Sequence, residues 1–445
     1  MSLTGAPAVS GSPGKVEHAR VAYVMSRFPK LTETFVLFEI LAVEEHQVAV
    51  DVYPLLRARN TSSHPEGAGL VSKLLELVRH PAGGAVMHPE ARPLVERAHF
   101  LPFLSPAVLR AQVTFISRRP RTYVRTVCAL VRAAWGSTNF LLGALAIFPK
   151  TVLAAQMMER DRVSHVHAHF ANHPATAALI IQRLVGIPYS FTAHGSDIQV
   201  DSRMLCQKIR EASFVATVAH ANRQLMIAEC DDRVGEKIHV IRAGVDTEVF
   251  KPRERQAPDL FTILCVGTLY EVKGQRYLID ACSLLRDDGA DFRCVLVGDG
   301  ADADTLREQV HALELDRNVE FAGRLTRDEV ASLLGDADVL VAPSVQAADG
   351  RREGIPVVLV EAMATETPVI ATDISGISEL VDDGENGILV APGDAQAIAG
   401  ALRRLGSDNE LRRRMGSSGR KKVLREFDLR ANAAALAARF AEQGT

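Results

Sequence analysis

Short apolar runs alternate with stretches whose apolar residues recur at helical spacing, and this order holds along most of the chain. A short apolar run bounded by turn residues is typical of a buried strand, whereas apolar positions three and four residues apart indicate a helix. In the first half the pattern predicts helices at Thr34–Glu45 and Pro174–Val185, and strands at Arg20–Met25, Gln47–Tyr53, His165–His169, Tyr189–Thr192, Phe214–Val218 and Ile238–Ile241.

The second half repeats the pattern more regularly. Its predicted strands are Phe261–Val266, Arg293–Val297, Val319–Phe321, Val339–Ala342, Val369–Ala371 and Gly387–Val390. The helical stretches between them lie near Gln275–Arg286, Asp302–Leu313, Arg327–Gly335, Val357–Ala364 and Ile377–Val381. Strands that alternate with helices predict parallel, doubly wound sheets. The expected fold class is therefore α/β with Rossmann-like domains.

The length of 445 residues exceeds one ordinary compact core, so we expect two domains. Residues 1–18, rich in Gly, Ala, Ser and Pro, are expected to be a disordered leader. The charged, proline-bearing segment 251–258 is the expected linker between an N-terminal domain (19–250) and a C-terminal domain (259–425), with a last helix within 426–445. Two such domains joined by one linker predict a cleft at the carboxyl ends of both sheets.

Charge is distributed unevenly along the chain. Residues 1–252 carry 28 Lys and Arg against 21 Asp and Glu, a net charge of +7, whereas residues 253–445 have a net charge of −10. No acidic residue occurs from Arg97 to Met158, although that stretch is rich in arginine and in apolar residues. A basic, amphipathic helical insertion at about 97–158 predicts contact with an anionic membrane surface. The alternative is a pair of ordinary helices with a solvated basic face, and no nucleic-acid motif accompanies the segment.

The six cysteines include no CxxC pair, which predicts neither a disulfide framework nor a zinc ribbon and favours a reducing compartment. The N-terminal segment lacks the basic and apolar regions of a signal peptide. The longest strongly apolar run, Phe140–Pro149, is shorter than a membrane span requires.

The most specific chemistry lies in the segment Glu353–Glu361 (EGIPVVLVE), which follows a predicted strand and a loop. Pro356 suits the first turn of a helix, where its missing N–H costs nothing. The amides of Gly354 and Ile355 would then lie at the positive end of that helix and bind an anion. A phosphate there, with one carboxylate on each side, fits a diphosphate that carries a sugar at each end. The alternative is a buried helix with an acidic cap and a stray Glu361.

Two further loops follow predicted strands. Lys273 lies in a loop with Gly267 and Thr268, where a lysine can neutralise phosphate, although many such loops carry a lysine without a ligand. His194 lies in the segment Thr192–Asp197 (TAHGSD), where it could exchange hydrogen bonds with a substrate hydroxyl or serve only the structure.

Three histidines, at positions 165, 167 and 169, share one face of a predicted strand. Such a face could hold a metal ion. No carboxylate or cysteine cluster completes a metal site in the sequence around them, so packing at the end of the strand is the favoured interpretation.

Taken together, these residues resemble glycosyltransferase family 4, a retaining family with the GT-B fold, over about residues 20–425. The E-x7-E element of the family appears as Glu353 and Glu361. Four further segments resemble the bacterial exopolysaccharide and colanic-acid branch of this family. They are Ser26–Phe35 (SRFPKLTETF), His167–Phe170 (HAHF), Thr192–Asp197 and Ala347–Pro356 (AADGRREGIP). The resemblance implies two Rossmann-like domains that face each other across a cleft, a last helix that crosses back onto the N-terminal domain, and no metal cofactor.

The resemblance also implies roles for matching positions. Catalytic roles would fall to His194, Lys273 and Glu353. The donor, a UDP- or GDP-sugar, would contact Gly267, Thr268, Lys273, Arg324, Glu353, Gly354, Ile355, Pro356 and Glu361, with Lys273 on the diphosphate, Glu353 on the sugar and Glu361 on the ribose. The acceptor side would include Thr32, Glu33, Thr34, Phe35 and Asp197.

One position departs from the family pattern. Thr268 stands where the family usually has an arginine beside the donor diphosphate. Removing one such charge typically costs about 2–4 kcal/mol of barrier. The side chain of Arg27, Arg351 or Arg352 could replace it.

The expected function is a cytoplasmic, membrane-associated retaining transferase that moves a sugar from a nucleotide-diphosphate sugar to a lipid-linked saccharide in bacterial cell-surface polysaccharide synthesis. One alternative keeps the chemistry but uses a small soluble acceptor. Another is a catalytically weak protein that binds nucleotide sugars within a synthesis complex, for which Thr268 is the support.

Overall fold

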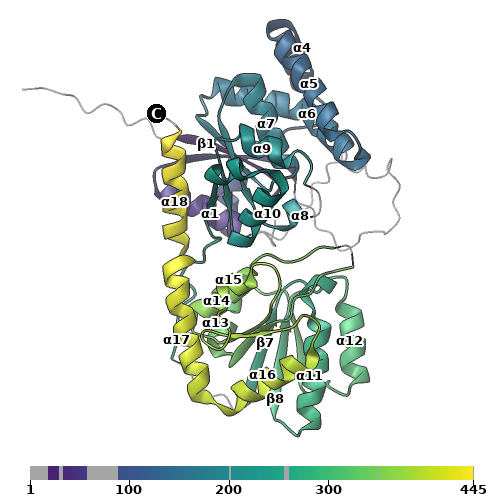
Figure 1. Cartoon of the computed structure of the whole chain (residues 1–445), viewed down its shortest axis with the longest axis vertical. Coiled ribbons are helices and arrows are strands. Elements are labelled where there is room, and N and C mark those ends of the chain that lie inside the picture. The colour runs from purple at the N-terminus through teal and green to yellow at the C-terminus, as the bar shows by residue number, and fades with distance from the viewer. Residues whose placement is uncertain are drawn as a thin grey trace, which may run out of the picture.

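The chain folds into two lobes, each built on a parallel six-stranded sheet with a core on either face. Figure 1 shows the computed structural model, which describes residues 19–29, 34–57, 89–199, 202–254, 260–348 and 350–443. The expected α/β class with two Rossmann-like domains is confirmed. The expected leader and part of the expected linker, residues 255–258, lie outside the described residues.

The sheet of the N-terminal lobe has the strand order β2-β1-β3-β4-β5-β6. Its strands are β1 (Arg20–Phe28), β2 (Ala49–Arg57), β3 (His165–His169), β4 (Tyr189–Ala193), β5 (Phe214–Thr217) and β6 (Ile238–Val240). Its helices are α1 (Thr34–Glu45), α3 (Arg92–Arg97), α4 (Pro106–Arg118), α5 (Pro120–Ala134), α6 (Thr138–Arg160), α7 (His173–Val185), α8 (Ser196–Gln199), α9 (Leu205–Glu211) and α10 (His220–Cys230), with 3₁₀ turns η2 (Pro89–Ala91) and η3 (Asp232–Lys237). Strands β3, β4 and β5 are buried throughout, as expected for strands that helices cover on both faces.

The sheet of the C-terminal lobe has the strand order β12-β11-β10-β7-β8-β9. Its strands are β7 (Phe261–Val266), β8 (Phe292–Val297), β9 (Val319–Gly323), β10 (Val339–Ala342), β11 (Val369–Thr372) and β12 (Ile388–Val390). Its helices are the 3₁₀ turn η4 (Glu271–Lys273), α11 (Gln275–Asp287), α12 (Ala303–Ala312), α13 (Arg327–Asp336), α14 (Val357–Ala364), α15 (Ile377–Leu380), α16 (Ala395–Ser407) and α17 (Asn409–Glu426). Because β7 pairs in parallel with both β8 and β10, the loops that follow these strands lie at the same edge of the sheet.

The last helix, α18 (Leu429–Glu442), packs on the N-terminal lobe although it follows the C-terminal lobe in sequence. The Phe440 ring lies edge-on to Tyr23 of β1 at 6.2 Å and lies 6.0 Å from the Phe214 ring of β5. Helices α17 and α18, yellow in Figure 1, run along one side of both lobes and connect them a second time.

Helix α6 differs from the sequence expectation. The apolar run that begins at Phe140 continues through Pro149 to Arg160 as one helix. Among the described residues this is the one segment long and apolar enough to cross a membrane, so the expectation drawn from Phe140–Pro149 is wrong on length. Length and composition alone are weak grounds for a span, because core helices meet the same test. Here 56% of the segment is buried, against neighbours that include α4 and α7.

The cysteines also depart from expectation. Cys206 of α9 and Cys230 of α10 form a disulfide with a Cα–Cα separation of 5.2 Å. Two cysteines that are 24 residues apart carry no motif that predicts their pairing, and only the packing of α9 against α10 brings them together. The sequence argument for a reducing compartment therefore loses its support.

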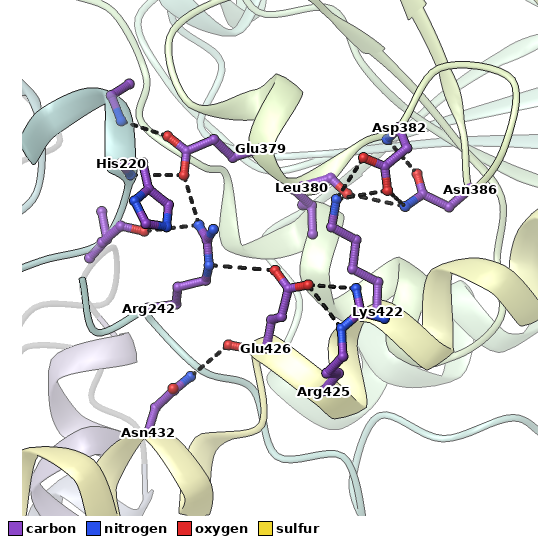
Figure 2. A network of polar contacts seen from close by, with 12 residues as sticks. His220, Arg242, Glu379, Leu380, Asp382, Asn386, Lys422, Arg425, Glu426 and Asn432 are labelled. Carbon is purple, nitrogen blue, oxygen red and sulfur yellow. Dashed lines mark hydrogen bonds and ion pairs between the residues drawn. The ribbon is translucent and has the colours of Figure 1, made fainter. Parts of the chain in front are cut away.

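A polar network connects the two lobes. Both carboxylate oxygens of Glu379, in α15, accept hydrogen bonds from the amides of His220 and Ala221 at the start of α10 (2.8 and 2.7 Å). Arg242, which follows β6, donates from Nη1 to Glu379 at 3.1 Å, and its Nε lies 3.8 Å from Glu426 of α17. Figure 2 shows that these contacts join segments of both lobes.

Candidate functional site

A cavity of about 300 Å³ lies between the lobes. Residues from loops and helix starts of both lobes line it, among them Phe35, Phe170, His194, Arg351, Arg352, Glu353, Gly354, Ile355 and Val357. Such positions near the carboxyl ends of parallel strands are where ligands bind in open α/β sheets.

The ion pair of Lys273 and Glu353 lies beside this cavity. The Nζ of Lys273 is 2.5 Å from Oε1 of Glu353, and the two side chains are 21% and 17% exposed. The hydroxyl of Ser344 donates to the other carboxylate oxygen at 2.9 Å. The fold thus brings together the two residues expected to contact diphosphate and sugar. Sequence reasoning missed Ser344, although its place just after a predicted strand was an available signal.

Two glycines allow the lysine loop to pack closely. At Gly274, where φ is +67°, a Cβ atom would stand 1.9 Å from the carbonyl oxygen of Pro343. A Cβ atom at Gly267 would lie 3.3 Å from the Cδ and Cε atoms of Lys273. The neighbouring Thr268 accepts a hydrogen bond from Gln275 through its carbonyl oxygen at 3.0 Å. Close backbone packing therefore holds the position of Lys273.

The helix α14 spans Val357–Ala364, as the spacing predicts, but Pro356 lies before its first turn rather than in it. Pro356 has φ −61° and ψ 123°, so it is the N-cap and Val357 is the first helical residue. Gly354 and Ile355 precede the cap and line the cavity. A Cβ atom at Gly354 would come within 2.9 Å of the carbonyl oxygen of His194, so the absence of a side chain lets the two lobes meet at this point.

Arg351 and Arg352 line the cavity and both side chains are exposed. Nη2 of Arg352 donates to Gln346 at 2.7 Å. They are two of the three arginines that could compensate for Thr268. Arg324, expected to contact the donor, pairs with Asp299 at 3.0 Å on an exposed surface and does not line the cavity.

Glu361 is one turn along α14 from Val357, a cavity residue, and therefore shares its face of the helix. Glu361 itself does not line the cavity. Burial raises the pKa of Glu361 to about 7, and the charge of Arg327 opposes this shift. The Arg327 guanidinium lies 3.9 Å from the ring centre of Phe38 in the N-terminal lobe, so Glu361 is close to the junction of the lobes.

His194 follows β4 and lines the cavity, with its ring 5.0 Å from that of Phe35 and 4.6 Å from that of Phe170. Burial and the neighbouring His169 hold the pKa of His194 well below its ordinary value. Asp197 accepts hydrogen bonds from the amides of Ala171, His194 and Gly195 at 2.6–3.0 Å. The Asp197 carboxylate is buried and lies outside the cavity lining, so it holds the histidine loop in shape.

The histidine strand faces the core. His165 and His167 both contact the hydroxyl of Ser190 at 2.7 and 2.8 Å, and the second nitrogen of His167 lies 3.0 Å from the hydroxyl of Thr192. Burial lowers the pKa of His165 to about 3 and that of His167 well below its ordinary value. The ligand atoms of Glu39, His167 and His169 lie within 4.8 Å of one another. A metal ion bound there would have to displace one hydroxyl partner of His167, because each ring nitrogen of His167 contacts a hydroxyl.

On the expected acceptor side, Phe35 lines the cavity and Thr34 begins α1. Thr32 and Glu33 lie outside the described residues. The sequence did not single out Glu39 and Tyr23. Glu39 contacts His169, and the hydroxyl of Tyr23 donates a hydrogen bond to Glu39.

Comparison with known families and proteins agrees with this arrangement. Residues 246–422 match the family described as Glycosyl transferases group 1, and residues 104–249 match Glycosyltransferase Family 4. The chain is 30% identical over 429 residues to WcaL of Salmonella typhimurium, named for colanic acid biosynthesis, across 93% of this chain and 97% of WcaL. It is 39% identical over 171 residues to AmsK of Erwinia amylovora, named as an amylovoran biosynthesis glycosyltransferase, across 38% of this chain and 42% of AmsK.

Solved structures share the whole two-lobed architecture. Anabaena HepE in complex with UDP matches with a TM-score of 0.65 and 18% identity, across 95% of this chain and 100% of that one. Sucrose-phosphate synthase from Thermosynechococcus elongatus matches with a TM-score of 0.64 and 18% identity, across 95% and 98%. At such identity the likeness establishes the GT-B fold alone.

Proposed function

This chain belongs to glycosyltransferase family 4, and from that premise we propose that it transfers a sugar from a nucleotide-diphosphate sugar to a saccharide acceptor with retention of anomeric configuration. The observation that carries the proposal is the cavity in which Glu353, beside Lys273, faces His194 of the other lobe. UDP is the first nucleotide to test, because Anabaena HepE, which has the same fold, binds UDP.

In this reaction an acceptor oxygen forms a bond to the anomeric carbon of the sugar, the bond between the sugar and the diphosphate breaks, and negative charge grows on the leaving diphosphate. Lys273 and the amides at the start of α14 stabilise that charge, which is the main contribution expected of such a site. Arg351 and Arg352 line the same cavity and supply the charge that Thr268 lacks. The acceptor proton passes to an oxygen of the leaving phosphate, and the cavity keeps water from the bond that breaks.

Lys273 and Glu353 neutralise each other's charge as an ion pair. When a diphosphate enters, it competes with the Glu353 carboxylate for the ammonium group of Lys273. Glu353, still held by the hydroxyl of Ser344, is then available to accept hydrogen bonds from sugar hydroxyls. Donor binding and orientation of the sugar are thereby linked.

We further propose a lipid-linked acceptor in cell-surface polysaccharide synthesis, since WcaL and AmsK are named for such polymers. The surface of α4, α5 and the start of α6 supports a peripheral position on an anionic membrane. Its exposed apolar side chains are Leu104, Leu109, Val113, Ile116, Val124, Trp135, Leu142 and Leu145. Exposed arginines flank them, and no acidic residue lies between Arg97 and Met158. Because anionic lipid is concentrated in the cytoplasmic leaflet, we propose that the protein lies on the inner face of the plasma membrane.

Two alternatives remain distinguishable by experiment. A small soluble acceptor would leave this apolar and basic surface without a role. A weakly catalytic binding protein was suggested by Thr268 alone, and the two arginines in the cavity weaken that suggestion.

The proposed function is tested with the purified chain and a panel of UDP- and GDP-sugars. A nucleotide sugar that binds the folded protein should raise its melting temperature in a concentration-dependent way. Lys273→Ala should lower the rate of sugar transfer or donor hydrolysis by about 10²- to 10³-fold. Lys251→Ala, which removes a lysine from an exposed surface, is the matched control and should leave the rate unchanged. Absence of any stabilising nucleotide sugar, or full activity of Lys273→Ala, would contradict the proposal.

A further inference from the structure

We propose that Glu39 and His169 are positioning residues for the sugar-transfer reaction: together they determine which ring nitrogen of His194 carries the proton, so that His194 meets the donor sugar as a hydrogen-bond acceptor. The inference rests on the proposed function, because it concerns the histidine that faces the donor cavity.

A chain of polar contacts leads from the core to His194. The Nε2 of His194 lies 3.2 Å from Nδ1 of His169, and the two rings are stacked at 5.4 Å with an angle of 24°. The other nitrogen of His169, Nε2, lies 3.1 Å from Oε1 of Glu39. The hydroxyl of Tyr23 donates to the same Glu39 oxygen at 3.2 Å.

The carboxylate decides where the proton of His169 resides. The contact between His169 and Glu39 is close but lacks the angle of a full hydrogen bond, and the His169 side chain is entirely buried. A lone pair on Nε2 would face the lone pairs of a carboxylate oxygen, which is repulsive, whereas an N–H there is attracted to the oxygen. Nε2 of His169 therefore carries the proton, and its Nδ1 is left as an acceptor.

The same reasoning then applies to His194. Because Nδ1 of His169 is an acceptor, the nitrogen that faces it, Nε2 of His194, must carry a proton. Burial keeps His194 neutral, so the ring has one proton and its Nδ1 has the lone pair. The rings of Phe35 and Phe170 pack against His194 and limit its rotation. A sugar hydroxyl that meets the remaining nitrogen must donate to it.

The neighbouring polar groups leave this assignment undisturbed. Both nitrogens of His167 are near the hydroxyls of Ser190 and Thr192, which can adapt their protons to either tautomer. Burial raises the pKa of Tyr23 well above its ordinary value, so its hydroxyl stays a donor to Glu39. Among the described polar contacts that link Tyr23, Glu39, His169 and His194, Glu39 is therefore the one charged side chain.

The test uses the whole protein labelled with ¹⁵N-histidine, and a His194→Asn variant assigns the His194 signals. In the wild-type protein the imidazole shifts should report a proton on Nε2 of both His169 and His194. Glu39→Gln should shift His194 toward a mixture of tautomers and lower kcat about 10-fold. The Kd of UDP should stay within about two-fold, because UDP lacks the transferred sugar that His194 is proposed to meet. Tyr23→Phe, which keeps the ring packing, should have a smaller effect in the same direction.

Tyr189→Phe is the matched control. Its buried hydroxyl donates to the carbonyl oxygen of Lys208 at 2.7 Å, in the same lobe but outside the contacts to His194. This variant should lose similar stability without a change in kcat or in the tautomer. A wild-type His194 protonated on Nδ1, a doubly protonated His169, or a Glu39→Gln variant with unchanged tautomer and kcat would each overturn the inference. If no nucleotide sugar binds, the proposed function fails, and the wild-type and variant spectra still decide the tautomer.

Discussion

At the residue scale, burial changes what a carboxyl group can do. Glu361, which was predicted to bind the ribose of the donor, stands in an apolar helix segment. Burial raises the pKa of Glu361 to about 7. Near neutral pH the group is therefore divided between a carboxylate, which accepts strongly from hydroxyls, and a neutral acid. Because the folded-state pKa is raised, this group adds to stability at low pH and loses that contribution as the pH rises through about 7.

We predict that nucleotide binding strengthens as the pH rises through 7. If Glu361 holds the ribose as a carboxylate, the Kd of UDP should be up to about 10-fold weaker at pH 6 than at pH 8. Calorimetric titration across this range measures the effect, and the Glu361→Gln variant should bind weakly with little dependence on pH. A wild-type Kd that does not vary between these pH values would argue against the ribose role.

At the element scale, the surface of α4 and α5 combines features that are uncommon on a monomer. Leu109, Val113 and Ile116 recur at spacings of four and three residues and are 50–65% exposed, while the opposite face of α4 is buried. The hairpin of α4 and α5 projects from the N-terminal lobe at the end away from the C-terminal lobe (Figure 1). An apolar stripe beside basic side chains suits an anionic lipid surface.

We predict that Val113→Ser combined with Ile116→Ser weakens binding to anionic vesicles by about 10-fold, because less apolar area leaves water on contact. Co-sedimentation with phosphatidylglycerol vesicles at low salt measures this. Leu424→Ser, which changes a leucine of α17 that is 47% exposed, is the control and should bind normally. Equal binding of the double variant, or no preference for anionic over neutral vesicles, would be inconsistent with the proposed surface.

At the scale of the whole molecule, the position of the lobes determines whether the site exists. Residues that line the cavity come from both lobes, and Gly354 meets His194 where the lobes are in contact. Glu379 holds the start of α10 and Arg242 together (Figure 2), and a carboxylate is favoured at a helix N-terminus. This contact stabilises the arrangement in which the two halves of the site face each other.

We predict that Glu379→Ala loosens the lobes without unfolding either one. Loss of these charge-assisted hydrogen bonds removes about 2 kcal/mol of contact energy between the lobes. Small-angle scattering should show a larger radius of gyration, and the KM for the donor should rise. Asp382→Ala is the control, because its carboxylate binds Lys422 within the C-terminal half of the chain (2.8 Å) and does not join the lobes. An unchanged scattering profile for Glu379→Ala would show that this contact does not hold the lobes.

The sequence by itself determined the local elements and the chemistry of the C-terminal loops. Helical spacing predicted α1 and α14 with the bounds that the structure has, because the spacing of apolar residues along a helix is a local signal. Lys273, Glu353 and His194 were found because each follows a predicted strand, and strand ends of parallel sheets converge.

Only the tertiary structure decided how distant segments combine. The Cys206–Cys230 disulfide and the contact of Glu39 with His169 depend on packing between elements, and no spacing along the chain encodes them. The same holds for the pairing of Lys273 with Glu353, which are 80 residues apart, and for the approach of Gly354 to His194. Local patterns follow from backbone geometry, whereas these contacts require two lobes in one defined arrangement.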